Sequence, residues 1–536
     1  MLLDFDLDMQ INALEYFERG ASPKHRDKIA VIEPAARFTF GQIDAFAKNC
    51  AAAILARGVP LNAPIAVLLP KSAATIVADL GAMYCGNPYA NLDLKSPPER
   101  LKAILGNLGA PLIITAAEHA GVLTRLGVPA ERLLIIESAM VERAGGVPRG
   151  GLPPGGEPAA GVPAADVEAR LLARRERVID TDPLCIIHTS GSTGAPKGVA
   201  LNHRSTIDFM DWVLQRFEFD GSEIVGSLSP FYFDIYTLEL YLCLAKGATL
   251  VIIPEQLAAF PVKLLEFLEA ESVSFIFWVP TVMVNIANQQ LLPKFSLRAL
   301  RRVFFAGEVF PTKALNEWRR RLPQAQFVNL YGPIEISVDC TYFILDREMA
   351  DDEKLPIGFA CRNTDILILN DRDQAAEGAE HGELCVRGSS IALGYWNDPQ
   401  RTARAFVQNP LNPHYPEWIY RTGDIVYRNE RGEIMIVGRK DFQIKHMGYR
   451  IELGEIEHAA LRIPGIENVC AVYQAEKKII TLYFESGREL SDAQLREQLA
   501  AFLPKYMLPT RFHRLGQLPR NPNGKIDRNL LATRDA

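Results

Sequence analysis

A loop rich in hydroxyl groups and glycines follows an apolar segment near residue 190. Residues 184–189 read LCIIHT, which predicts a buried strand, and residues 189–198 continue as TSGSTGAPKG. Hydroxyl and exposed backbone N–H groups donate hydrogen bonds, and Lys197 adds a positive charge, so this composition suits a polyphosphate. The spacing differs from that of the Walker A loop. Read alone, the loop is equally compatible with a structural turn.

Two further turns combine a glycine with groups that bind nucleotides. Residues 329–335 read NLYGPIE, in which Tyr331 offers an aromatic face to a purine and Glu335 offers a carboxylate to Mg²⁺. Residues 420–424 read YRTGD, and the carboxylate of Asp424 can accept hydrogen bonds from both hydroxyls of a ribose. Taken singly, each turn is more typical of a structural role.

Two more motifs lie closer to the C-terminus. GRKD at 438–441 precedes GYRIELGEIE at 448–457, and PNGKID occupies 522–527. A lysine on an Asn-Gly turn, such as Lys525, is ordinarily a solvated surface residue. It can also serve as a cation that is delivered to an active site.

Together, and in this order, the five motifs resemble the superfamily of enzymes that form acyl and aminoacyl adenylates. That superfamily includes the amino-acid adenylation domains of nonribosomal peptide synthesis, acyl-CoA synthetases and luciferases. The resemblance extends over nearly the whole chain. It implies an α/β fold with a large N-terminal domain, built of mixed sheets, helices and a distorted barrel, and a small mobile α+β C-terminal domain. It also implies ATP and Mg²⁺ as cofactors.

The resemblance assigns roles to individual residues. The positions that would bind the nucleotide are Thr189, Ser190, Gly191, Ser192, Thr193, Gly194, Tyr331, Gly332, Asp424 and Arg439. Lys197, Glu335 and Lys525 would be the catalytic positions, with Glu335 as the Mg²⁺ ligand. Lys525 would contact the substrate carboxylate and the α-phosphate, and Asp441 would be the hinge between the domains.

One position departs from the family pattern. The family usually has threonine in Y-G-P-T-E, where this chain has Ile334. A hydroxyl contact to the phosphates is therefore lost. We still expect activity because Tyr331 and Glu335 are retained. The departure is the one feature that favours the alternative of a non-catalytic nucleotide-binding protein.

Asp234 bears on the class of substrate. The segment FDIY at 233–236 aligns with the one that carries an aspartate for the substrate ammonium in members that activate α-amino acids. A buried carboxylate needs a cation or donors, and a fatty or aryl acid supplies neither. Asp234 thus favours an amino acid over the chemistry of a small-acid acyl-CoA synthetase. The alternative role for Asp234 is an N-terminal helix cap.

Motif alignment predicts a small, largely apolar amino-acid pocket. Its other positions are Ile235, Leu238, Phe277, Phe304, Ala306, Leu330, Val338 and Asp339. The set resembles that of free-standing prolyl-AMP ligases, which load proline onto a carrier protein, and L-proline is the predicted substrate. Asp339 departs from that pattern and is typical of serine-activating pockets, so serine, glycine and alanine remain alternatives. The chain contains no G-G-x-S carrier motif, which predicts a separate peptidyl carrier protein with a phosphopantetheine arm.

Composition limits the remaining choices. The 536 residues exceed what one core usually supports, and 48% hydrophobic with 23% charged residues is typical of a soluble globular protein. A net charge of −6 argues against a general nucleic-acid binder.

The eight cysteines form no C-x-x-C pair, which favours reduced, buried thiols. No basic-then-apolar leader and no apolar run of about 18 residues are evident, so we expect a cytoplasmic protein without a membrane helix.

Patterning along the chain predicts the domains. Apolar runs at 29–33, 64–70 and 111–117 alternate with helix-like segments, which indicates an α/β architecture with parallel strands. A stretch rich in Pro and Gly at 145–165 reads as an insertion. We expect an N-terminal adenylation domain at 1–438 and a C-terminal lid domain at 439–536. The latter should contain strands at 467–474 and 478–485 and a helix at 491–502.

Overall fold

The computed structural model describes residues 10–140, 143–144, 147–148, 164–191, 195–520 and 526–534. The chain divides into two compact units. The first unit comprises Met1–Leu92, Ala110–Ile187 and Val199–Val437. The second comprises Asp93–Gly109, His188–Gly198 and Gly438–Ala536. The domain boundary between residues 438 and 439 stays a prediction.

Two large sheets dominate the first unit, and parallel strands form the centre of each. The nine-stranded sheet has the order β17-β16-β15-β14-β13-β11-β12-β1-β2, and the seven-stranded sheet the order β20-β10-β9-β4-β3-β5-β6. The strands of the first sheet are β1 (Ile29–Glu33), β2 (Ala36–Thr39), β11 (Ile224–Ser227), β12 (Thr249–Ile252), β13 (Phe275–Trp278), β14 (Arg302–Phe305), β15 (Gln326–Tyr331), β16 (Thr341–Ile344) and β17 (Phe359–Ala360). Those of the second are β3 (Ile65–Leu68), β4 (Tyr89–Asn91), β5 (Leu112–Thr115), β6 (Leu133–Ile135), β9 (Pro183–Thr189), β10 (Lys197–Asn202) and β20 (Gly394–Tyr395).

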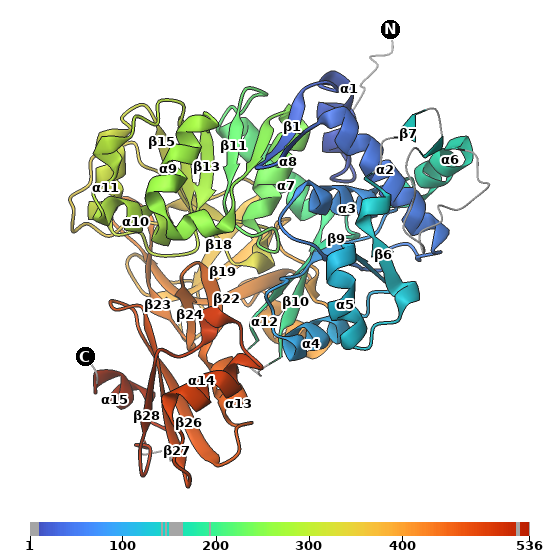
Figure 1. Ribbon diagram of the computed structural model, residues 1–536. Coiled ribbons are helices and arrows are strands. Elements are labelled where there is room, and N and C mark those ends of the chain that lie inside the picture. The colour runs from blue at the N-terminus through green and yellow to red at the C-terminus, as the bar shows by residue number, and fades with distance from the viewer. Residues whose placement is uncertain are drawn as a thin grey trace. The chain divides into compact units, whose positions relative to one another are not determined.

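Helices cover the sheets, which is why the central strands are apolar throughout rather than alternating. The described helices of the first unit are α1 (Ser22–Lys24), α2 (Phe40–Ala56), α3 (Ala73–Tyr84), α5 (Ala117–Arg125), α6 (Ala164–Arg175), α7 (His203–Arg216), α8 (Ile235–Lys246), α9 (Pro261–Ala270), α10 (Pro280–Asn288), α11 (Thr312–Arg321) and α12 (Pro399–Ala405). Figure 1 shows α9, α10 and α11 beside β13 and β15. Trp278 and Phe305 belong to the core cluster on that side, whereas Phe277 and Phe304 belong to the cluster that includes α8.

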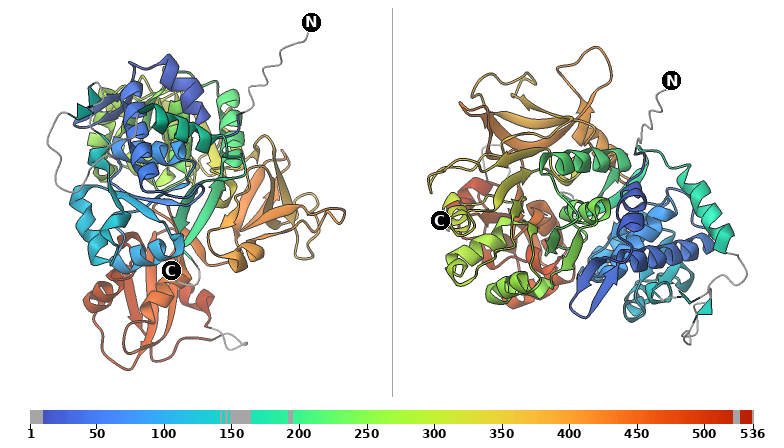
Figure 2. Two further views of the ribbon diagram at one scale, coloured as in Figure 1. Left: turned by 90° about the vertical axis from the view of Figure 1, so that its right-hand side faces the viewer. Right: turned by 90° about the horizontal axis from the view of Figure 1, so that it is seen from above.

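A five-stranded sheet forms a further layer of the first unit. It has the order β18-β19-β22-β21, with β23 paired to β22. The strands are β18 (Thr364–Leu369), β19 (Gly382–Gly388), β21 (Phe406–Gln408), β22 (Trp418–Arg428) and β23 (Ile434–Arg439). Both views of Figure 2 show this sheet in orange.

The second unit contains a three-stranded sheet that is covered on both faces. Its described elements are α4 (Pro98–Leu108), β24 (Gln443–His446), β25 (Tyr449–Glu452), α13 (Leu453–Ala460), β26 (Ile466–Gln474), β27 (Ile479–Ser486), α14 (Asp492–Ala500), β28 (Arg511–Arg514) and α15 (Arg528–Thr533). Ile456 of α13 and Leu495 of α14 share a core cluster with Leu482 of β27. Leu531 of α15 packs in a separate cluster with Tyr483, whose side chain points to the other face of the strand.

The fold bears out the expected class. The protein is α/β, with mixed sheets and helices in a large part and a smaller α+β part at the C-terminus. All eight cysteines are free and buried, as predicted. Within the Pro/Gly-rich stretch, the structure describes β8 (Val147–Pro148), which pairs with β7 (Arg143–Ala144), and the start of α6, while most of 145–163 lies outside the described residues. Among the helices of the described residues, none combines the length and apolar character that crossing a bilayer requires.

Candidate functional site

The apolar pocket candidates gather at the carboxyl ends of three parallel strands in the first unit. Phe277 on β13 is directly opposite Phe304 on β14, which in turn is opposite Val328 on β15. Side chains two residues apart share a face, so Ala306 and Leu330 follow on the same side of the sheet. In open α/β sheets, ligands bind outside the carboxyl ends of the strands. The location of these residues therefore fits a binding pocket.

Aromatic packing makes this group rigid. The rings of Phe277 and Phe304 meet edge to face at a centroid distance of 6.3 Å, and both side chains are fully buried. Ile235 and Leu238 of α8 and Val338 belong to the same core cluster. All seven predicted apolar positions thus belong to the main hydrophobic core, which extends well beyond them.

Asp234 lies at the entrance to α8 and is only partly buried. It occupies the N-cap position, but among the described residues no backbone N–H of the helix donates a capping hydrogen bond to its carboxylate. Its backbone carbonyl accepts a hydrogen bond from Thr237 N–H at 2.9 Å. Asp234 therefore lies at a helix-cap position, but its side chain does not cap the helix, which was the alternative role predicted for it.

The turn after β15 brings two chain segments unusually close. A Cβ atom on Gly332 would lie 2.5 Å from Asp339 Cα and 2.5 Å from Val338 O, so only glycine fits here. Val338 itself adopts φ 76°, and Ser337 before it φ 48°. A β-branched residue in the left-handed region is strained. Val338 and the buried Asp339 are thus held by a close backbone contact with the Tyr-Gly-Pro turn.

The nucleotide candidates of the first unit include one hydrogen-bonded pair, Tyr331 with Asp424, while Glu335 is held by a residue outside the candidates. Tyr331 Oη donates a short hydrogen bond to Asp424 Oδ2, and Asp424 N–H donates to Thr422 Oγ1 at 3.0 Å. Burial raises the pKa of Tyr331 well above its ordinary value, so its hydroxyl stays a donor. Glu335 is fully buried, and its Oε1 accepts a hydrogen bond from Tyr395 Oη at 2.8 Å. Two of the predicted residues, Tyr331 and Asp424, are in direct contact.

A magnesium site at Glu335 is compatible with these contacts. In the described part of the chain, no group of three or more His, Cys, Asp or Glu residues could hold a metal ion. Mg²⁺ does not need such a group, because it commonly binds one or two carboxylates together with substrate phosphates and water. The carboxylate of Glu335, fixed by Tyr395, fits an ion that arrives with a nucleotide.

Ser190 and Gly191 of the predicted phosphate loop belong to the second unit, where they donate hydrogen bonds to other protein groups. Ser190 Oγ donates to the backbone carbonyl of Arg450 at 2.6 Å, and Gly191 N–H donates to Glu455 Oε2 at 3.2 Å. Glu455 also forms a short ion pair with Arg100. Burial raises the pKa of Glu455, although Arg100 opposes this shift. The backbone N–H of Gly191, which the sequence assigns to phosphate, therefore donates to the carboxylate of Glu455 in this structure.

Other predicted residues are placed as follows. Thr189 ends β9, Lys197 begins β10, and both side chains are buried. Arg439 forms an ion pair with Asp441, at 2.6 Å from Nε to Oδ1. Burial raises the pKa of Asp441, but the Arg439 guanidinium outweighs this effect, so the net pKa is lowered. Four predicted positions lie outside the described residues, namely Ser192, Thr193, Gly194 and Lys525.

Comparison with protein families decides the identity of the chain. The model of the family described as AMP-binding enzyme matches residues 17–396. The chain belongs to this family. The matched range includes the loop after β9, the amino-acid pocket candidates and the Tyr-Gly-Pro turn, so the family assigned from the motifs is confirmed.

Individual relatives of this AMP-binding enzyme fall into two kinds. Gramicidin S synthase 2 of Brevibacillus brevis is 31% identical over 96% of the chain, but the chain spans only 11% of that protein. The L-proline--[L-prolyl-carrier protein] ligase of Streptomyces coelicolor is 30% identical over 96% of this chain and 95% of its own length. In fold, the chain resembles the Vibrio cholerae adenylation domain AlmE, with a TM-score of 0.79 and 23% identity over 97% of this chain and 96% of that one.

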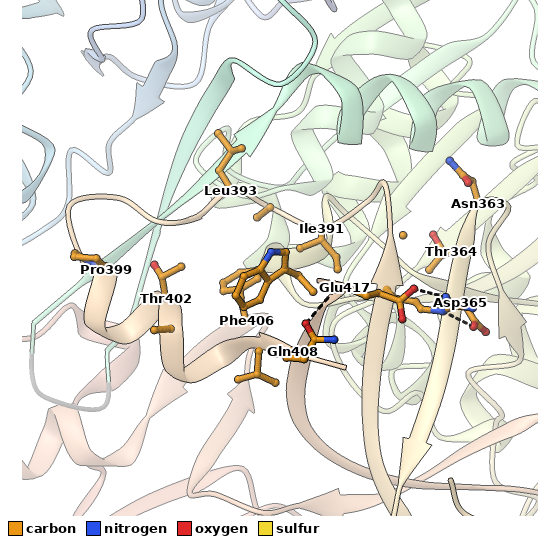
Figure 3. Close-up of a pocket in the computed structure, with 16 residues that line it drawn as sticks. Asn363, Thr364, Asp365, Ile391, Leu393, Pro399, Thr402, Phe406, Gln408 and Glu417 are labelled. Atoms are coloured by element: carbon orange, nitrogen blue, oxygen red, sulfur yellow. Dashed lines mark hydrogen bonds and ion pairs between the residues drawn. The ribbon is translucent and has the colours of Figure 1, made fainter. Parts of the chain in front are cut away.

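A large cleft of the AMP-binding enzyme lies elsewhere in the first unit. It has a volume of about 1100 Å³ and is lined from β18, β19, α12, β21 and β22 (Figure 3). Ile391, Leu393 and Phe406 provide apolar surface, and Glu417 forms an ion pair with Arg387 at the cleft. Among the described residues that line it, none is a predicted nucleotide or amino-acid position. We assign this cleft no part in the reaction proposed below.

Sequence reasoning missed two residues that contact the candidates, and the arginine that pairs with one of them. Tyr395, which holds Glu335, is 60 positions away and belongs to no motif that was singled out. Glu455 stands inside GYRIELGEIE, so its motif was recognised but its ion pair with Arg100, 355 positions away, was not. A buried carboxylate requires a partner, and that rule could have prompted a search for an arginine without identifying which one.

Proposed function

We propose that this AMP-binding enzyme activates L-proline as prolyl-AMP, with release of pyrophosphate, and passes the prolyl group to the phosphopantetheine thiol of a separate carrier protein. The observation that carries the proposal is the similarity to the L-proline--[L-prolyl-carrier protein] ligase, which extends over nearly the full length of both chains. The apolar cluster at the ends of β13, β14 and β15 supports a small substrate.

The pocket chemistry fits proline. At neutral pH proline carries a secondary ammonium and a carboxylate on a compact apolar ring. Asp234, partly buried at the start of α8, is proposed to pair with the ammonium. Phe277, Phe304 and Leu330 are proposed to contact the ring, since an apolar surface excludes water and polar side chains. Large aromatic substrates would collide with the two phenylalanines.

The reaction requires one anion to attack another. The carboxylate of the amino acid must reach the α-phosphorus of ATP, so alignment and charge neutralisation are the tasks of the protein. Lys197 and Lys525 are proposed to supply positive charge, and Asp424 to fix the ribose. When bound at Glu335, Mg²⁺ would neutralise phosphate charge and polarise the P–O bonds. No covalent protein nucleophile is needed.

Serine is the second candidate because of one observation. Asp339 is a buried carboxylate beside the strained Val338, only 3% exposed, and it could accept a hydrogen bond from a substrate hydroxyl. Proline has no hydroxyl to offer. Glycine, alanine and small organic acids are the remaining alternatives, and the last would bring no ammonium group to Asp234.

Amino-acid-dependent exchange of pyrophosphate into ATP tests the first half of the proposal. We expect proline to give the dominant signal over serine, glycine, alanine and acetate. A dominant serine signal would transfer the assignment to Asp339. Exchange with acetate alone would remove the role of Asp234. Absence of exchange with every substrate would contradict an enzymatic role and point to Ile334.

Thiol transfer tests the second half. Pantetheine is a simple acceptor that requires no knowledge of the carrier. We expect prolyl-pantetheine, detected by mass spectrometry, to form only when enzyme, ATP and proline are all present. Formation of prolyl-AMP without any thioester, even with a phosphopantetheinylated carrier protein as acceptor, would contradict the transfer step.

A further inference from the structure

A buried polar cluster borders the segment that carries Asp234. Asp79 lies on α3, Asn91 on β4 and Tyr236 in the first turn of α8, and all three belong to the first unit. Their exposed fractions are 0, 8 and 2%, so the cluster is shielded from solvent. None of these residues is among the positions that would contact the proposed substrates.

The carboxyl group of Asp79 receives hydrogen bonds from two other elements. Tyr236 Oη donates to Asp79 Oδ2 at 2.9 Å, and Asn91 Nδ2 donates to the same oxygen at 3.0 Å. Asn91 Nδ2 also lies 3.4 Å from the backbone carbonyl of Phe231, which it can donate to. Asp79 therefore links α3 to Tyr236, and Asn91 links β4 of the seven-stranded sheet to Phe231.

Those two tethered residues flank Asp234 in the sequence. The rings of Phe231 and Tyr236 stack with centroids 4.0 Å apart and an angle of 20°. Between them, Phe233 N–H donates to the carbonyl of Pro230 at 3.1 Å. The segment thus closes on itself and is fixed at both ends, which leaves the backbone of Asp234 little freedom to move.

A second set of contacts fixes the same segment from the other side. Lys71 Nζ donates to the carbonyl of Ser227 at 2.7 Å and lies 5.5 Å from the ring centroid of Phe231. Ser227 Oγ donates to Glu239 Oε2 at 2.5 Å, which joins the end of β11 to α8. The end of the strand, the connecting segment and the helix are therefore held as one piece.

Stability alone does not account for this cluster. Burial raises the pKa of Asp79 to about 8, which reflects the penalty of keeping a carboxyl group away from water. Apolar side chains of similar volume would fill the space without that penalty. What a carboxyl group adds is direction, because two donors must converge on one oxygen atom.

We propose that Asp79 and Asn91 are positioning residues for substrate binding, which hold Phe231 and Tyr236 and thereby fix Asp234 where it meets the substrate ammonium. The inference rests on the proposed function. It extends the amino-acid site to residues that contact no substrate. A small displacement of Asp234 should weaken amino-acid binding and leave ATP binding intact.

Removal of a single hydroxyl tests the inference. Tyr236→Phe should raise KM for proline about tenfold in the exchange assay, while KM for ATP stays within about twofold. Tyr241→Phe is the matched control, because it also removes a buried hydroxyl from α8. That hydroxyl lies 3.5 Å from Met83 Sδ and donates no hydrogen bond to Asp79. Equal changes in the two variants, or equal changes in both KM values, would overturn the inference.

A pair of changes at Asp79 separates positioning from packing. Asp79→Asn retains an oxygen acceptor and should keep KM for proline within about threefold, whereas Asp79→Ala should raise it about tenfold or more. If Asp79→Ala fails to fold, the comparison of Tyr236→Phe with Tyr241→Phe still decides. Absence of amino-acid-dependent exchange in the unaltered enzyme would contradict the proposed function and this inference together. Normal exchange with an unchanged KM in Tyr236→Phe would overturn this inference alone.

Discussion

The role of a single carboxylate, Asp234, distinguishes the two leading classes of substrate. Its side chain is partly exposed at the start of α8 and, within the described residues, receives no capping hydrogen bond from the helix. If the carboxylate of Asp234 does not contact the substrate, its replacement should change substrate binding little. If it pairs with a substrate cation, its replacement should weaken binding strongly, since charged hydrogen bonds contribute about 1.5–3 kcal/mol.

Asp234→Asn should therefore raise KM for proline about 10- to 100-fold and change KM for ATP little. Exchange assays at varied proline and varied ATP would measure both values. Asp371→Asn, an exposed aspartate of the first unit, serves as the control and should behave as the unaltered enzyme. An unchanged KM for proline in Asp234→Asn would remove the ammonium contact from the proposal.

Gly332 provides a second test at the scale of one residue. A Cβ atom there would meet backbone atoms of Val338 and Asp339 at 2.5 Å, and backbone cannot move aside as a flexible side chain can. Gly332→Ala should lower the free energy of unfolding by about 1–3 kcal/mol, as overpacking does. Urea denaturation would measure this loss. Gly516→Ala, where a Cβ atom meets nothing within 4 Å, should leave stability nearly unchanged, and equal losses would contradict the close contact.

Sequence motifs identified the candidate residues, but not their partners. Tyr331 and Asp424 were selected separately as adenine and ribose contacts, and the structure joins them by a hydrogen bond across 93 positions. Nothing in either motif encodes that pairing, because it depends on how β15 and β22 are arranged. The same holds for Tyr395 with Glu335.

At the scale of elements, short apolar runs were reliable. The runs at 29–33, 64–70 and 111–117 contain β1, β3 and β5, since each run is apolar, short and bounded by turns. The predicted helix at 491–502 is α14, which starts after Ser491 in a capping box with Gln494 and ends at Ala500. Strand β28 was missed because RFHR has only one buried residue, Phe512, and its pairing with β27 is long-range.

The start of α7 is linked to the N-terminal segment by a titratable side chain. His203 Nδ1 accepts a hydrogen bond from Ala13 N–H at 3.0 Å, which requires an unprotonated nitrogen. Burial lowers the pKa of His203 to about 4, against about 6.5 in the unfolded chain. Between these values the unfolded chain binds more protons, so stability is present above pH 6.5 and is lost as pH falls toward 4.

The free energy of unfolding should therefore fall by about 2 kcal/mol from pH 7 to pH 5 through His203 alone. His203→Asn keeps an acceptor for Ala13 N–H and cannot titrate, so its stability should depend less on pH by that amount. Denaturant titrations at the two pH values would measure the difference. His188, whose pKa burial lowers to about 3, is present in both proteins and cancels in the comparison. Identical pH dependence in both proteins would contradict the role of His203.

At the scale of the whole molecule, the proposed function consists of two half-reactions with different requirements. Adenylate formation brings two anions together, whereas thiol attack on prolyl-AMP expels a nucleotide that has already lost its pyrophosphate. A positively charged side chain beside the α-phosphate accelerates the first step, in which that phosphate is attacked, and has little effect on the second. A cation needed only for adenylation should therefore be dispensable for transfer, and Lys525 is the residue to which the proposal gives that role.

Lys525→Ala should slow proline-dependent pyrophosphate exchange about 100-fold or more, because it removes a charge that stabilises the transition state of the first step. Transfer from chemically synthesised prolyl-AMP to pantetheine should stay within about threefold of the unaltered enzyme, since that step is proposed not to use Lys525. Lys505→Ala, an exposed lysine of the same C-terminal segment, is the control and should leave both rates unchanged. Equal losses in both half-reactions would mean that Lys525 acts throughout or maintains the fold, and equal retention would assign the adenylation charge to Lys197 alone.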